Sequence, residues 1–237
     1  MIELKDLTVR FGGVTALDAV SAVFTAPVSG IIGPNGAGKT TTMNVVSGFL
    51  PAGGSILYNG EVISRLSPHQ RARWGLRRSF QREQIADDLS VIDNLRVMLD
   101  TLPGSANQKR ADAEKALSVC GLEGRAYTLA ASLNTYERRL TDVARCLVGG
   151  PKIVMLDEPA GGLTQEETQH LGDLILKIHP LTGASTLLID HDVDLISRIC
   201  EQTLVLDFGR RIALGPTQKV LEDPKVQTAY LGIEEVN

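Results

Sequence analysis

The sequence predicts an α/β fold built on a mostly parallel sheet. Short apolar strands alternate with helices from residue 153 to 207, an order that is typical of parallel sheets. A glycine-rich loop joins an apolar strand at 28–32 to a helix at 39–47. Between these regions, residues 82–150 show mainly helical spacing. We therefore expect an α/β core that is interrupted by a helical insertion.

The first part of the core is recognised by alternating side chains and by turn residues. Residues 2–9 alternate apolar and polar side chains and predict a strand with an irregularity near its middle. A second extended stretch covers 20–24. Asn59-Gly60 between apolar flanks is typical of a β-hairpin. A serine-proline pair at the start of 67–73 predicts an N-cap and the first turn of a short basic helix.

The insertion and the second part of the core follow from helical periodicity and capping residues. Helical spacing predicts helices at 91–100, 108–120 and 136–148. The core resumes with a strand at 153–156, and a capping box then opens a helix over 164–179. The remaining expected elements are a strand at 185–189, a helix to Cys200, a strand at 203–207, a turn at Gly209 and two short terminal helices.

Composition bounds the class of protein. The chain has 237 residues, of which 43% are hydrophobic and 22% charged, as in ordinary globular domains. A formal net charge of −4 disfavours bulk nucleic-acid binding. Without a signal-like start or a run of about 18 apolar residues, the chain is expected to be cytoplasmic and to reach a membrane only through a partner. The cysteines are well separated and are expected to be free in a reducing compartment: Cys120, Cys146 and Cys200.

The glycine-rich loop predicts binding of a nucleoside triphosphate. Residues 33–40 fit the pattern G-x-x-x-x-G-K-[ST] between a predicted strand and a predicted helix. Such glycines let backbone N–H groups turn toward a phosphate, Lys39 reaches the terminal phosphates, and Thr40 can bind Mg²⁺. The expected nucleotide contacts are Gly33, Pro34, Asn35, Gly36, Ala37, Gly38, Lys39, Thr40 and Thr41.

Acidic and basic side chains follow two further strands. Asp157 and Glu158 come directly after the buried strand 153–156. Asp157 can hold Mg²⁺ opposite Thr40, and Glu158 can polarise a water molecule for attack on the γ-phosphate. His191 follows the strand 185–189 at the sheet edge where ligands bind, which favours contact with the same phosphate. Without the phosphate loop, an N-cap or a solvated loop would be the better interpretation of the two acids.

Taken together, these motifs resemble those of the ATP-binding subunits of ABC transporters over nearly the whole chain. The resemblance implies a RecA-like core of 1–81 and 151–237, with a small antiparallel sheet and a helical subdomain at 82–150. It also implies ATP and Mg²⁺ as ligands, and a membrane permease that contacts the chain on the inner face of the membrane. The matching motifs are Phe11 for adenine stacking, the phosphate loop, Gln81 as a catalytic and metal-binding glutamine, Asp157, the catalytic Glu158 and His191.

Within this family, two segments are similar to the subunits that power branched-chain amino-acid and urea importers. They are 10–17 and 229–234. Residues 70–73 and 137–139 are also similar to the lipopolysaccharide-export ATPase. The importer is the preferred interpretation, and the resemblance implies transport of amino acids or similar small polar solutes.

The family's Leu-Ser-Gly-Gly-Gln signature is altered here. In the family, this segment opens a helix and contacts the γ-phosphate that the other subunit holds. Gly161-Gly-Leu-Thr164 also replaces the usual Ser-Ala-Leu-Asp, and the capping box explains Thr164 without a catalytic role. An intact phosphate loop beside a weakened signature suggests an asymmetric pair with a different ATPase subunit. The signature segment consists of Leu133, Asn134, Thr135, Tyr136 and Glu137.

Two other functions compete with this hypothesis. A nucleotide-clamping subunit with little turnover is favoured by the altered signature and disfavoured by Glu158 and His191. A soluble ABC ATPase that acts on DNA or ribosomes ranks last, because such proteins commonly carry two cassettes or long insertions.

Overall fold

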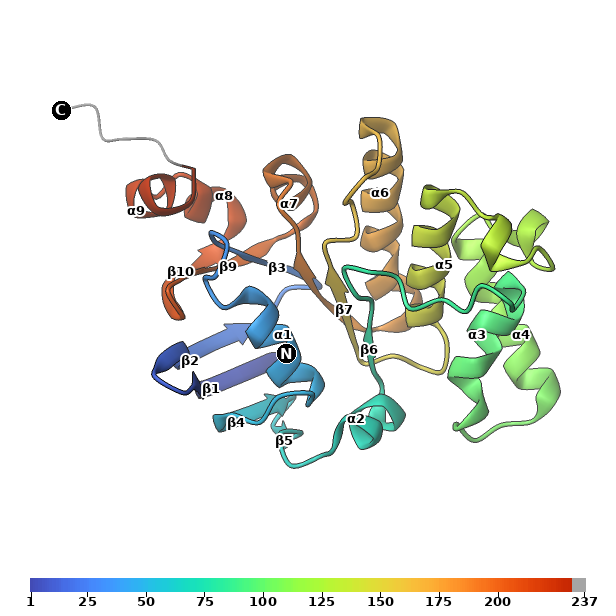
Figure 1. Ribbon diagram of the computed structural model, residues 1–237, viewed down its shortest axis with the longest axis horizontal. Coiled ribbons are helices and arrows are strands. Elements are labelled where there is room, and N and C mark those ends of the chain that lie inside the picture. The colour runs from blue at the N-terminus through green and yellow to red at the C-terminus, as the bar shows by residue number, and fades with distance from the viewer. Residues whose placement is uncertain (232–237) are drawn as a thin grey trace. The chain divides into compact units, whose positions relative to one another are not determined.

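The computed structural model describes residues 1–231 (Figure 1). Contacts within the chain group it into two compact units. The first unit comprises Met1–Arg71 together with the chain from Leu187 onward, and the second comprises Ala72–Thr186. The predicted division at 81 and 150 stays a prediction. Residues 232–234, the end of the importer-like segment, lie outside the described residues.

An antiparallel sheet occupies the N-terminal part of the first unit. Its strand order is β2-β1-β4-β5, and all neighbours are antiparallel, as the resemblance implied. Asp6 adopts a positive φ of 50° where the pairing of β1 with β2 shifts register, which is the expected irregularity. The second strand begins earlier than predicted. The prediction missed its first residues because they are exposed and lack a regular alternation of apolar and polar side chains. The strands are β1 (Ile2–Phe11), β2 (Val14–Phe24), β4 (Gly53–Tyr58) and β5 (Glu61–Val62).

Parallel pairing in the first unit joins β3 (Val28–Ile32) to β9 (Gln202–Asp207). All residues of β3 are buried, as its apolar sequence predicts. β10 (Arg210–Pro216) pairs antiparallel with β9; it is mostly exposed, and the sequence did not predict it. The helices that begin in this unit are α1 (Lys39–Ser47), α2 (Pro68–Trp74), α7 (Val193–Ile199), α8 (Thr217–Leu221) and α9 (Pro224–Val226), followed by a π-helix at Gln227–Leu231.

The second unit pairs β6 (Leu76–Arg78) in parallel with β7 (Ile153–Asp157). β6 was not predicted, because it is short and contains two arginines. Three helices, α3, α4 and α5, contact one another, as Figure 1 shows. The helices are α3 (Val91–Asp100), α4 (Ala106–Val119), α5 (Thr135–Leu147) and α6 (Gln165–Thr182), with 3-10 turns at Glu123–Arg125 and Ala130–Ser132. β8 (Ser185–Ile189) contains the boundary between the units.

Helix boundaries follow local capping residues. α1 and α3 have the predicted bounds. α4 begins two residues earlier than predicted, because Ser105 is the N-cap and Gln108 is the third helical residue of a capping box. The free cysteines are buried, as expected. Within residues 1–231, no helix is long and apolar enough to cross a membrane.

Candidate nucleotide site

The phosphate loop lies between β3 and α1 in the first unit. Gly36 and Gly38 have φ values of 82° and 103°, which glycine adopts without strain. The Lys39 ammonium donates hydrogen bonds to the carbonyls of Gly33 (2.7 Å) and Pro34 (3.0 Å), so the lysine lies along the loop. The next residue, Thr40, is exposed at the start of the helix. This arrangement places a helix N-terminus and a cation where a phosphate would bind.

The loop is braced from behind by the turn between β9 and β10. The Gly209 N–H donates to the Ala37 carbonyl at 3.0 Å, and the Asp18 N–H donates to the Gly209 carbonyl at 2.9 Å. A Cβ atom at Gly33 would lie 2.1 Å from the Leu206 carbonyl oxygen, so β9 approaches the loop too closely for a side chain. The phosphate loop is therefore held by contacts with β9 and with the turn between β9 and β10, and this turn is itself bonded to β2.

Two other predicted residues belong to the first unit. Phe11 ends β1 and is 53% exposed, which is compatible with stacking on a base. His191 is exposed between β8 and α7. Its neighbours fix the local turn: the Asp192 N–H donates to Oδ1 of the buried Asp190 at 3.0 Å, and Asp192 caps α7 by accepting from the Leu195 N–H.

Asp157 ends β7 in the second unit and is buried. Its Oδ2 lies 2.9 Å from Nη2 of Arg78, and both side chains of this ion pair are nearly excluded from water. The Asp157 N–H donates to the Ser79 hydroxyl at 3.3 Å. Arg78 also lies over the Phe80 ring, 4.7 Å from its centroid. Sequence reasoning missed Arg78 and Ser79, because nothing in the pattern distinguishes them from their neighbours.

Gln81 and Glu158 come together in the second unit. The Gln81 side-chain amide donates to Glu158 Oε2 at 2.7 Å. Glu158 is half-buried and has a φ of 50°, a conformation that costs energy for a residue with a Cβ atom and that recurs at functional sites. The backbone thus turns sharply after Asp157, so that the two adjacent acids point to different partners.

The signature segment begins α5, and the side chains of Asn134 and Glu137 form hydrogen bonds or ion pairs with other residues of the same chain. Asn134 Oδ1 accepts from the Glu137 N–H at 2.8 Å, and Glu137 Oε2 accepts from the Asn134 N–H at 3.1 Å. Arg125 forms an ion pair with the other carboxylate oxygen of Glu137 at 2.7 Å. Thr135 is exposed in the first turn. Tyr136 is half-buried, and burial raises the pKa of its hydroxyl.

Thr164 forms the capping box that the sequence predicts. Its hydroxyl accepts from the Glu167 N–H at 3.3 Å, and its own N–H donates to the Glu167 carboxylate at 2.8 Å. Thr164 therefore has a structural role as the N-cap of α6.

The side chains predicted to hold Mg²⁺ carry oxygen atoms, the ligands that this ion prefers. Thr40 belongs to the first unit, and Asp157 and Gln81 belong to the second. Thr40 offers a hydroxyl, Asp157 a carboxylate and Gln81 an amide oxygen. Mg²⁺ usually retains several waters and binds one or two carboxylates together with substrate phosphates, so a small protein donor set suffices. Arg78 forms its ion pair with one carboxylate oxygen of Asp157, which orients that side chain.

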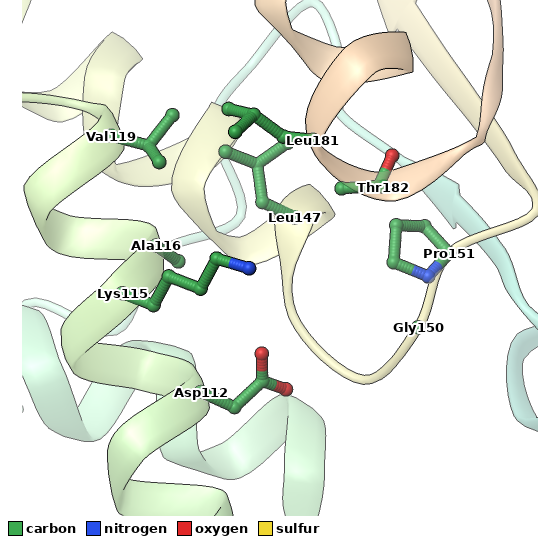
Figure 2. A pocket seen from close by; sticks show the side chains of 9 residues that line it. All are labelled: Asp112, Lys115, Ala116, Val119, Leu147, Gly150, Pro151, Leu181 and Thr182. Carbon is green, nitrogen blue, oxygen red and sulfur yellow. The ribbon is translucent and has the colours of Figure 1, made fainter.

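A separate hollow of about 230 Å³ lies between the ends of α4, α5 and α6 (Figure 2). Asp112 and Lys115 line one wall, and Pro151 and Leu181 line the opposite one. None of the predicted site residues lines this pocket. The prediction of nucleotide binding therefore stays with the phosphate loop.

Comparison with protein families gives one clear match. The family model described as "ABC transporter" matches residues 21–161, more than half of the chain. That range contains the phosphate loop, Gln81, the signature segment and both acids at the end of β7.

Curated relatives and solved structures match along nearly the whole chain. The high-affinity branched-chain amino acid transport ATP-binding protein BraF of Pseudomonas aeruginosa is 36% identical, with 98% of each chain covered. The corresponding protein LivG of Escherichia coli is 34% identical with the same coverage, and the lipopolysaccharide export ATP-binding protein LptB of that species is 33% identical over 96% of this chain and 95% of its own. The ADP conformation of MJ1267, an ATP-binding cassette of an ABC transporter, matches with a TM-score of 0.87 and 28% identity over 98% of this chain and 99% of that one.

Proposed function

The chain belongs to the ATP-binding proteins of ABC transporters, whose ATP hydrolysis is coupled to transport, and on this premise we propose that it powers an importer of amino acids or similar small polar solutes. The observation that carries ATP binding is the phosphate loop, in which Lys39 lies against two loop carbonyls at the N-terminus of α1. The importer assignment rests on the relatives BraF and LivG, which match the chain over 98% of its length.

Binding and hydrolysis are assigned to different residues. Backbone N–H groups of 33–41 and the Lys39 ammonium stabilise the phosphate charge, and Phe11 stacks on the adenine. Glu158 orients or deprotonates the attacking water, held in place by Gln81. His191 contacts the γ-phosphate. In phosphoryl transfer, such positioning and charge stabilisation supply nearly all of the catalysis.

Mg²⁺ is the proposed metal, held by Thr40 and Asp157 with the amide oxygen of Gln81 nearby. A bound Mg²⁺ would supply charge neutralisation for the nucleotide phosphates. Arg78 fixes the Asp157 carboxylate by the ion pair at 2.9 Å through one of its oxygens, Oδ2.

The proposed partners are a second ABC ATPase subunit and membrane permease subunits. Contact with the permease would place the chain on the inner face of the membrane, and the segment from Gln81 to Leu95 is proposed to meet a short cytoplasmic permease helix. The net charge of −4 gives no support for a nucleic-acid partner.

The second ATPase subunit is proposed to be a different chain. In this chain two polar side chains of the signature are already bound: Asn134 and Glu137 cap α5, and Arg125 holds Glu137. Tyr136 adds bulk where glycine normally allows close approach. This signature would therefore serve the partner's nucleotide poorly, whereas the chain's own loop, Glu158 and His191 would form the active site with a partner's normal signature.

Two alternative functions are also proposed, and the ATPase assays described below test them. The similarity to LptB supports a lipopolysaccharide-export type of ATPase. The altered signature supports a subunit that clamps ATP with little turnover.

The first test is Mg²⁺-ATPase activity of the purified chain alone and after mixing with ABC ATPase subunits encoded beside it. Activity that requires mixing and is lost in Glu158→Gln supports the asymmetric pair. Rapid hydrolysis by the chain alone would contradict it, and would show that the altered signature functions in a homodimer. ATP binding without hydrolysis in every mixture would favour the clamp.

A further inference from the structure

Arg139 occupies the second turn of α5 and is directed into the second unit. Its side chain is only 9% exposed. Nη1 donates to the Gln81 carbonyl at 3.4 Å, and Nη2 donates to the Gly161 carbonyl at 3.3 Å. The carboxylate of Glu83 lies 3.4 Å from Nη1 and balances the buried charge. One guanidinium therefore joins α5 to the loop after β6 and to the loop after β7.

The same two loops meet again at Glu158. The Gln81 side-chain amide donates to Glu158 Oε2 at 2.7 Å, and the Gly161 N–H donates to the Glu158 carbonyl at 3.2 Å. Gln81 and Gly161 thus each contact Arg139 through a carbonyl oxygen and Glu158 through a nitrogen. These bonds form a closed ring of four residues in which Arg139 and Glu158 face each other.

We propose that Arg139 is a positioning residue that holds Gln81 and Glu158 in the geometry needed for hydrolysis; this inference rests on the proposed role of Glu158. The backbone of Glu158 has a φ of 50°, and such a conformation persists only when its surroundings fix it. The bonds to Gly161 and Gln81 provide that restraint, and Arg139 anchors both of these residues to a helix.

The planar guanidinium is suited to this task. Its N–H groups point in fixed directions, so one side chain can reach two carbonyls and a carboxylate at once. A lysine would keep the positive charge beside Glu83 but would lack the rigid fork. The Arg139→Lys variant therefore separates the bridging of the two loops from simple charge balance.

Arg138 provides a matched control on the same helix. Its Nη1 donates to Asp87 Oδ1 at 2.7 Å and to the Ala130 carbonyl at 3.0 Å. Arg138 is thus an ion-paired arginine of α5, and its partners Asp87 and Ala130 are not among the four residues of the ring. Replacing it tests whether any loss of an α5 arginine has the same effect.

The decisive measurement is steady-state ATP hydrolysis by the full chain assembled with its partner ATPase subunit. We expect Arg139→Lys to lower kcat about tenfold to a hundredfold, the scale for misplacing a catalytic group by about 1 Å. KM for MgATP should change less than about twofold, because the phosphate loop is untouched and binding is not altered. Arg138→Lys should leave both constants near the wild-type values.

A double-mutant comparison separates positioning from general stability. If Arg139 acts through Glu158, Arg139→Lys should lower the residual rate of Glu158→Gln by much less than it lowers the wild-type rate. Equal losses in the two backgrounds would overturn the inference. A wild-type kcat in Arg139→Lys would overturn it as well, while leaving the proposed function intact.

Hydrogen exchange of the full chain alone provides a readout that does not require turnover. We expect faster amide exchange around Gly161 in Arg139→Lys, and no change there in Arg138→Lys. Unchanged exchange in both variants would overturn the inference. If the wild-type assembly hydrolyses no ATP and Glu158→Gln has no effect, the proposed function fails instead, and the exchange result still decides whether Arg139 restrains the loop.

Discussion

Arg78 and Asp157 form a buried ion pair in which Nη2 lies 2.9 Å from Oδ2, with side chains that are only 4% and 6% exposed. The two residues end neighbouring parallel strands, β6 and β7, so the sheet itself brings them together. The same arginine lies against the Phe80 ring. The acid proposed to bind Mg²⁺ is therefore held from one side by a fixed cation.

Removing that cation should destabilise the protein strongly. We expect Arg78→Met to lower the free energy of unfolding by about 3–5 kcal/mol, because it leaves a buried carboxylate unpaired. Urea denaturation measures the change. The exposed pair of Arg210 with Asp18, at 2.8 Å, is the matched control, and Arg210→Met should cost no more than about 1 kcal/mol. Similar losses in the two variants would show that burial of the first pair has no energetic consequence.

Gly33→Ala should disrupt the phosphate loop. The new Cβ would lie 2.1 Å from the Leu206 carbonyl oxygen, so either the loop or β9 must shift. We expect this variant to lose binding of a fluorescent ATP analogue in titrations. At Gly36 an added Cβ meets no atom within 4 Å, although φ is 82°. Gly36→Ala should therefore weaken binding less, and the reverse order would contradict the structural explanation.

Asp142 should make stability depend on pH. Burial raises the pKa of this carboxyl from 3.8 to about 6, against the opposing effect of Arg145 and Arg139 and with some help from Glu83. The folded state thus holds the proton more tightly than the unfolded state. Stability from this group is therefore greatest below about pH 4 and is lost as pH rises through about 6, by about 3 kcal/mol in total.

The Asp142→Asn variant isolates this contribution. The difference in unfolding free energy between wild type and variant should fall by about 2 kcal/mol from pH 4 to pH 7, since other groups cancel. Denaturation in urea at several pH values measures it. A difference that stays constant over this range would show that Asp142 titrates normally.

Asn134 should contribute to stability as a helix cap. Asn134→Ala removes the acceptor of the Glu137 N–H and is expected to cost about 1 kcal/mol. Asn134→Ser retains a capping oxygen and should cost only a few tenths of that amount. Thr164→Ala, in the capping box of α6, is the comparator and should resemble Asn134→Ala. A neutral Asn134→Ala would indicate that the asparagine is available for another role.

The cysteine thiols should be unreactive in the folded chain. Burial raises the pKa of Cys120 and of Cys200 to about 12, and it also raises the pKa of Cys146. Since the thiolate is the reactive form, labelling with a disulfide reagent at pH 8 should be slow. In urea all of them should react rapidly. A thiol that reacts rapidly without denaturant would contradict the burial seen here.

Local sequence patterns alone determined several helices of this protein and its phosphate loop. The helices 39–47 and 91–100 and the capping box at Thr164 were predictable, because glycines, caps and helical periodicity act over a few residues. The phosphate loop was predictable for the same reason. Its glycines, lysine and threonine are adjacent in sequence, so their spacing already contains the geometry that a phosphate needs.

Tertiary structure decided which other side chains complete the site. Gln81 and Glu158 are 77 residues apart, and Arg139 lies 58 residues from Gln81, so no local pattern could pair them. Arg77 and Arg78 look alike in sequence, yet Arg77 donates to backbone carbonyls such as that of Val148, whereas Arg78 binds Asp157. Adjacent residues on a strand point to opposite faces, and only the pairing of β6 with β7 determines which arginine meets the carboxylate.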